Sequence, residues 1–88
     1  MKYHVEFTER ALKQLKKLDK QTARLITAWI RKNIENSENP RAFGKGLTSN
    51  LSGKWRYRIG DYRVIADIQD EKVLILVLNI GHRRDIYK

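Results

Sequence analysis

The segment at residues 73–78 constrains the fold of this chain most, because each of its residues is apolar. A strand with one face in water alternates apolar and polar side chains, whereas a strand buried on both faces is apolar throughout. The segment therefore predicts a central strand of a sheet. A chain of 88 residues has room for one small core, so we expect residues 1–88 to form a single domain.

The first part of the chain predicts one strand and two helices. Residues 3–7 alternate as a half-buried strand does. Thr8 is a suitable N-cap for a helix over residues 9–18, and Asp19 is one for a helix over residues 20–35. Both helices have apolar residues spaced for one buried face, so we expect a helical hairpin that packs on the sheet.

The second part of the chain predicts a loop followed by a meander. Turn formers and glycines after residue 35 indicate a long loop, which Phe43 and Leu47 should pin to the core. Strands are predicted over residues 55–59, 62–68 and 73–80, with tight hairpins at residues 60–61 and 70–71. Together the elements predict an α+β fold: an N-terminal strand, a two-helix hairpin, and an antiparallel meander that completes a four-stranded sheet.

The charge of the chain indicates an anionic partner. Nineteen Lys and Arg residues against ten Asp and Glu residues give a formal net charge of +9, which attracts any phosphate polymer. A merely solvated basic surface or an acidic protein partner are the alternatives. No cysteine is present, and two isolated histidines without a carboxylate at ligand spacing predict neither a metal site nor a cofactor. No apolar run approaches the roughly 20 residues of a membrane span, so we expect a cytoplasmic protein with no membrane partner.

The strand at residues 55–59 should carry the functional surface. Its side chains alternate across the sheet, so Trp55, Tyr57 and Ile59 share one face. Lys54, Arg56 and Arg58 share the other. Guanidinium groups bind phosphate oxygens through paired hydrogen bonds and keep their charge at physiological pH. We therefore expect the aromatic face to pack under the helices, and the cationic face to be open and to bind nucleic acid.

Four segments in this order and spacing resemble the RelE toxins of bacterial toxin–antitoxin modules, within the wider RelE/ParE superfamily. They are Phe-Thr-Glu-Arg-Ala-Leu-Lys at 7–13, Asn-Pro-Arg at 39–41, Trp-Arg-Tyr-Arg-Ile-Gly-Asp-Tyr-Arg at 55–63 and Gly-His-Arg-Arg-Asp-Ile-Tyr at 81–87. The resemblance implies the fold predicted above. It also implies a ribosome-dependent endoribonuclease, because typical members of that family cleave messenger RNA in the ribosomal A site.

The resemblance also implies which residues act. The family's basic and C-terminal aromatic positions fall on Arg56, Arg58, Arg63, Arg83 and Tyr87. Cleavage without a metal needs a base for the 2′-hydroxyl, stabilisation of the charged phosphorus centre, and a proton for the leaving 5′-oxygen. Arg56, Arg63 and Arg83 are the candidates for the phosphate, with Arg58 as a further contact. Some family members have lysines in place of the first pair, but arginine does not lose its proton, so Arg56 and Arg58 are poor bases.

The general base is either Tyr87 or His82. Neighbouring guanidinium groups should lower the pKa of a phenol, which favours Tyr87. His82 has a more suitable unperturbed pKa, but it adjoins Arg83 in an extended segment and should point to the opposite face.

Further basic residues are candidates for RNA contacts around this centre. They are Lys54, His82, Arg84 and three lysines of the first helix, Lys13, Lys16 and Lys17. The helix lysines have an ordinary alternative interpretation as a solvated helix face.

Three functions remain open from the sequence. The first is an mRNA endonuclease that is the toxin of a toxin–antitoxin pair, the second is a non-nuclease inhibitor of DNA gyrase as in the ParE branch, and the third is an RNA-binding module without cleavage. A toxin of this kind needs a RelB-like antitoxin, which should lay an amphipathic, partly acidic segment over the sheet and the helix pair. We expect a monomer when the toxin is free and a hetero-oligomer with the antitoxin.

Overall fold

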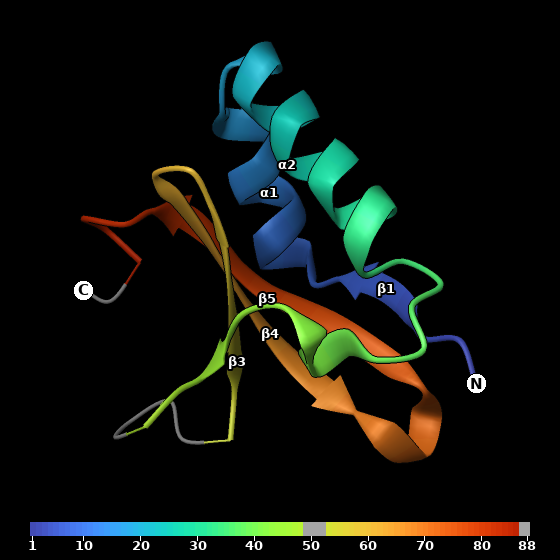
Figure 1. The fold of residues 1–88 in the computed structure, drawn as a ribbon. Helices are drawn as coiled ribbons and strands as arrows, with labels where there is room; N and C mark the ends of the chain where they lie inside the picture. The colour runs from blue at the N-terminus through green and yellow to red at the C-terminus, as the bar shows by residue number, and fades with distance from the viewer. Residues whose placement is uncertain (49–52, 87–88) are drawn as a thin grey trace.

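The computed structural model describes residues 1–48 and 53–86 and shows two helices packed on one face of a five-stranded mixed sheet (Figure 1). The sheet order is β1-β5-β4-β3-β2. The elements are β1 (His4–Phe7), α1 (Glu9–Lys17), α2 (Lys20–Asn33), β2 (Lys45–Gly46), β3 (Trp55–Ile59), β4 (Tyr62–Gln69) and β5 (Leu74–His82), with short 3₁₀ turns η1 (Pro40–Ala42) and η3 (Asp70–Lys72). The predicted α+β class is confirmed.

Both predicted helix caps are present. The Thr8 side chain accepts a hydrogen bond from the Ala11 N–H at 3.1 Å, and Asp19 accepts one from the Thr22 N–H at 3.1 Å. Each helix ends slightly earlier than predicted. Glu35 lies outside α2, where its carboxylate accepts a hydrogen bond from the Val5 N–H at 3.0 Å and so covers the outer edge of β1.

The central position predicted for the apolar segment is confirmed. β5 lies between β1, which it pairs in parallel, and β4, which it pairs in antiparallel orientation. The predicted strand count was wrong by one, because Lys45 and Gly46 form the short strand β2 beside Arg56 and Trp55. Two residues are too few to show a strand period, so the sequence reads as loop there. The second predicted hairpin is instead the η3 turn, which ends at Val73 with φ of 52°.

The core lies between the helices and the sheet. It contains Ile26 and Ile30 of α2, together with Tyr57, Val64 and Val77 of the sheet. The aromatic face of β3 is therefore the packed face, as predicted. The buried Tyr57 hydroxyl donates a hydrogen bond to the Pro40 carbonyl oxygen at 2.6 Å, and burial raises the pKa of this phenol. The bond fixes the 3₁₀ turn η1 to the sheet.

The loop that precedes β3 is held through Trp55. The Trp55 indole N–H donates to the Phe43 carbonyl oxygen at 2.7 Å, and the Phe43 ring packs edge-on against Trp29 with centroids 5.6 Å apart. Gly44 has φ of +81°, and a Cβ there would lie 2.2 Å from the Arg56 carbonyl oxygen. Leu47 is half-buried, and its N–H donates a hydrogen bond to the Lys54 carbonyl oxygen at 3.0 Å. The loop thus reaches β3 through backbone contacts that only glycine permits at position 44.

Candidate nucleic-acid interface

The two helices cover one face of the sheet and leave the other open (Figure 1). Tyr57 and Ile59 of β3 pack into the core, so the cationic side chains that alternate with them lie on the open face. Direct cross-strand partners share a face, so the register places Arg58 beside Arg63 of β4 and Arg56 beside Lys45 of β2. Lys54 lies on the same side, with its amino group 3.6 Å from the Asp67 carboxylate. The predicted grouping of Lys54, Arg56 and Arg58 is therefore present in the structure.

Arg83 comes from a third segment to the same end of the sheet. It follows β5, its N–H donates to the Asp61 carbonyl oxygen at 2.8 Å, and its Nε lies 3.9 Å from the Asp61 carboxylate. Asp61 is in the turn between β3 and β4, so Arg83 lies beside the hairpin that carries Arg58 and Arg63. We call Arg58, Arg63 and Arg83 the guanidinium end of the sheet.

Arg63 is at the predicted position, but its side chain is mostly covered. Only 7% of its surface is exposed, and its Nη1 donates hydrogen bonds to the carbonyl oxygens of Gly60 at 3.0 Å and Tyr62 at 3.1 Å. The guanidinium group therefore braces the hairpin turn as well as adding charge to the site. Arg58, its cross-strand partner, is exposed.

The end of the described chain folds back toward this group. The N–H groups of Asp85 and Ile86 donate to the His82 carbonyl oxygen at 2.8 and 3.1 Å. Ile86 is buried, and its Cδ1 lies 3.4 Å from the position that a Cβ of Gly81 would occupy. Gly81 is the cross-strand partner of Arg63. Tyr87, the candidate base, lies outside the described residues.

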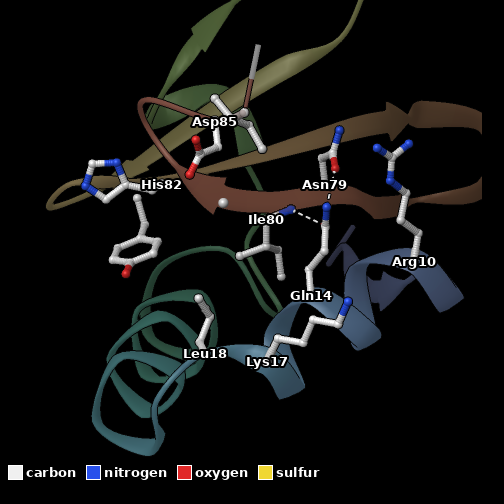
Figure 2. Close-up of a pocket in the computed structure, with 11 residues that line it drawn as sticks. Arg10, Gln14, Lys17, Leu18, Asn79, Ile80, His82 and Asp85 are labelled. Carbon is white, nitrogen blue, oxygen red and sulfur yellow. Dashed lines mark hydrogen bonds between the residues drawn. The ribbon is translucent and has the colours of Figure 1, made fainter. Parts of the chain in front are cut away.

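His82 points away from the guanidinium end. Its ring packs edge-on against Tyr62, with centroids 5.5 Å apart, and Nδ1 accepts a hydrogen bond from the Arg84 N–H at 3.2 Å. His82 lines a groove between α1 and the end of β5, with Arg10 and Lys17 across from it (Figure 2). The structure therefore does not bring His82 together with the arginines, which agrees with its predicted orientation.

The lysines of α1 form a second basic surface. Lys13, Lys16 and Lys17 are exposed on the helix layer, which covers the face opposite to Arg56. Lys13 pairs with Glu9 one turn earlier at 3.6 Å. Arg84 is exposed beyond β5. These candidates for RNA contacts are thus separate from the open face of the sheet.

Lys45 belongs to the open face and was missed by the sequence analysis. It is exposed and directly beside Arg56. Its two glycine neighbours gave the only signal, since they allow the chain to approach β3 closely, but they fit a loop equally well.

The open face offers cations for a polyanion and no evident cage for a metal. Within residues 1–48 and 53–86, the structure has no group of three His, Cys, Asp or Glu side chains that could hold a metal ion. In the same part of the chain, neither helix has the length and apolar character to cross a membrane.

Comparisons with known proteins agree with this geometry. A model of the ParE toxin of type II toxin–antitoxin systems matches residues 5–87. The chain belongs to the ParE toxin family. Within it, the chain is a RelE-type toxin: the toxin RelG of Mycobacterium tuberculosis is 33% identical over 88 residues and is covered to 99%, with 100% of this chain aligned. The mRNA interferase toxin RelE of Escherichia coli is 32% identical over 84 residues, which cover 94% of this chain and 85% of the relative.

The fold of this RelE-type toxin matches solved toxin structures. The RelBE2 toxin–antitoxin complex of Mycobacterium tuberculosis contains a chain that superposes with a TM-score of 0.85 at 29% identity, covering 97% of this chain and 95% of that one.

Proposed function

We propose that this RelE-type toxin is an endoribonuclease that cleaves messenger RNA in the ribosomal A site without a metal ion. The observation that carries the proposal is the convergence of Arg58, Arg63 and Arg83 from three segments at one end of the open face. The Escherichia coli relative, whose name describes an mRNA interferase, supports the same reaction. The exposed Lys45, Arg58 and Arg83 give this side of the sheet positive charge that suits the backbone of an extended RNA strand.

The reaction is an attack within the RNA. The 2′-oxygen forms a bond to the adjacent phosphorus while the bond from phosphorus to the 5′-oxygen breaks, which leaves a cyclic phosphate and a 5′-hydroxyl end. Guanidinium groups stabilise the extra negative charge that develops on the phosphate oxygens. We assign this role to Arg56 and Arg83, with Arg63 holding the hairpin and adding charge, and Arg58 as a further phosphate contact.

Tyr87 is the proposed base that takes the proton of the 2′-hydroxyl. Positive charge lowers the pKa of a phenol, and the guanidinium end supplies that charge beside Gly81, against which Ile86 packs. His82 is the weaker candidate because its ring faces Tyr62 and the α1 side. The same proton, returned to the leaving 5′-oxygen, completes the balance.

The remaining basic residues extend the contact with RNA. Lys45 and Lys54 continue the open face along β2 and β3, so we assign them to the message on either side of the cleaved bond. Lys13, Lys16, Lys17 and Arg84 lie outside that face and are assigned to ribosomal RNA.

A RelB-like antitoxin is the protein partner. The solved relatives include RelB and RelE complexes from Mycobacterium tuberculosis and Escherichia coli. A basic open face requires a complementary cover when the toxin is held inactive, so we assign a partly acidic, amphipathic antitoxin segment to the sheet and the helix pair.

Primer extension on messages during translation tests the proposed activity. We expect cuts at codon spacing with the wild type, and their loss in Arg83→Ala and Tyr87→Phe. Arg24→Ala, an exposed arginine on α2, is the matched control and should leave the cuts unchanged. Intact messages together with DNA double-strand breaks would overturn the proposal in favour of gyrase inhibition, and RNA binding without any cuts would leave a binding module.

A further inference from the structure

Among residues 1–48 and 53–86, no strand lies on the β1 side of the end of β5 that leads to Arg83. The parallel pairing of β1 with β5 stops at Phe7 and Val77, and the Thr8 N–H makes the last backbone bond, to the Val77 carbonyl oxygen at 3.0 Å. A bulge follows, since Ala66 pairs with Val77 but Ile65 pairs with Asn79. Leu78 is the bulge residue, and its carbonyl oxygen accepts a hydrogen bond from the Thr8 hydroxyl at 3.4 Å. Residues 79–82 pair with β4 on one side and line the groove beside α1 on the other.

The side chain of Gln14 occupies the place of the missing strand. Its Oε1 accepts a hydrogen bond from the Ile80 N–H at 2.7 Å, and its Nε2 donates one to the Asn79 side-chain oxygen at 2.7 Å (Figure 2). A side-chain amide has the same donor and acceptor as a peptide group. Gln14 thus binds the Ile80 N–H that a neighbouring strand would bind, and it also holds the Asn79 side chain.

The segment of β5 that Gln14 holds leads directly to the proposed site. Gly81, the residue after Ile80, pairs with Arg63, and Arg83 binds the hairpin turn through Asp61. A shift of β5 at Ile80 would therefore move Arg83 relative to Arg63. Arg10 and Lys17 line the same groove as Gln14, so Gln14 lies between basic residues of α1 and the end of β5.

We propose that Gln14 is a positioning residue for the guanidinium end: through Asn79 and Ile80 it fixes the unpaired end of β5, and thereby the place of Arg83, without touching RNA. This inference rests on the proposed function, which supplies the activity that depends on Arg83. Its role as a positioning group requires the amide-like pattern of hydrogen bonds rather than mere bulk at position 14.

Four substitutions separate these requirements. Gln14→Leu keeps the size and removes both hydrogen bonds. Gln14→Glu keeps an acceptor for Ile80, and Asn79 can turn its amide to donate to the new carboxylate. Asn79→Asp likewise accepts from the Gln14 amide, whereas Gln14→Glu with Asn79→Asp places two carboxylates against each other. Gln21→Leu, the same change at an exposed position of α2, is the control.

The measurements are amide hydrogen exchange at Ile80, the Arg83 amide chemical shift, and the kinetics of cleavage on programmed ribosomes. For Gln14→Leu and the double variant we expect exchange at Ile80 to rise about tenfold or more, since a lost protein hydrogen bond exposes the N–H. We expect the Arg83 amide signal to move and kcat to fall about tenfold with KM within about twofold, because an interaction that aligns the transition state is lost. Both single conservative variants should remain close to the wild type.

The inference is overturned if Gln14→Leu folds and keeps its kcat and Arg83 signal, or if Gln14→Glu is as impaired as Gln14→Leu. If Gln14→Leu does not fold, the double variant and its two single parents give the same comparison. If the wild type cuts no message, the proposed function fails, and the exchange rate at Ile80 with the Arg83 signal still decides whether Gln14 positions the strand.

Discussion

The two ends of the sheet use arginine in different ways. At the end formed by the η3 turn, Arg41 makes two hydrogen bonds of 3.0 Å to the Asp70 carboxylate, and the Tyr3 hydroxyl donates to the same carboxylate at 2.7 Å. Arg41 also lies 6.0 Å from the centroid of the Trp55 ring. We call Tyr3, Arg41 and Asp70 the carboxylate end. It ties β1, the loop and the η3 turn together.

At the guanidinium end, the cross-strand neighbour of Arg58 is another arginine, Arg63. Like charges that face each other across strands are destabilising. The acid beside Arg83, Asp61, is 3.9 Å away, a longer approach than the 3.0 Å of the carboxylate end. Hydrogen bonds and an ion pair thus join distant segments at the carboxylate end, whereas the guanidinium end concentrates positive charge.

The comparison predicts its largest effect for Arg58→Ala. Cleavage should fall by about tenfold to a hundredfold, since Arg58 is a phosphate contact in the proposed site and a hydrogen bond to a charged group contributes about 1.5–3 kcal/mol. Thermal stability should stay level or rise slightly, because the repulsion with Arg63 is removed. Cleavage kinetics on translated messages and a thermal melt of the same preparation measure both. A variant that cleaves normally, or that loses activity only by unfolding, would contradict the contrast between the two ends.

A substitution in the loop that precedes β3 should lower the stability of the fold. We expect Gly44→Ala to destabilise the fold by about 2 kcal/mol or more, because it combines a left-handed φ with a Cβ against the Arg56 backbone. Gly53→Ala is the matched control: it has φ of +88°, and no atom of residues 1–48 or 53–86 outside its chain neighbours lies within 4 Å of the new Cβ, so it measures mainly the backbone strain. Urea unfolding of both variants gives the difference. Equal losses would show that the contact with β3 contributes nothing.

Arg41→Ala should affect stability but not cleavage, in contrast to Arg58→Ala. The pair with Asp70 is partly exposed, so we expect its loss to lower the melting temperature by only a few degrees. Cleavage should remain within about twofold of the wild type, because a solvent-exposed pair of this kind contributes under about 1 kcal/mol and contacts no RNA in the proposed site. Arg41→Lys should recover part of the stability, since lysine keeps the charge but not the two-pronged geometry. If the Arg41→Ala protein is stable but does not cleave RNA, the two ends of the sheet do not differ in function as proposed.

Much of this arrangement could be predicted from alternation alone. The face that Arg56 and Arg58 share follows from the period of two in β3, and the Gly60 turn fixes the register with β4. The central place of β5 follows from its unbroken apolar run. These features depend on near neighbours in the sequence, which is why they are readable without coordinates.

The features that were missed depend on contacts between distant residues. Arg41 and Asp70 are 29 positions apart, and Gln14 and Ile80 are 66 positions apart. Lys45 joins the site through a two-residue strand whose position depends on the left-handed conformation of Gly44. No local pattern encodes such contacts.

A fall in pH should lower the stability of the fold slightly through the carboxylate end. Hydrogen bonds from Arg41 and then from Tyr3 hold the pKa of Asp70 below its usual value of 3.8. A carboxylate with a lowered folded-state pKa contributes stability above the unfolded-state pKa, and this contribution is lost as pH falls through the folded value. The wild type should therefore lose more melting temperature than Asp70→Asn between neutral pH and the acid range below 3.8. Arg41→Ala removes the main cause of the lowered pKa but keeps the carboxyl group, so the pH dependence of its melting temperature should resemble that of Asp70→Asn. If the melting temperatures of all three proteins fall in parallel with pH, the carboxylate end does not couple folding to protonation.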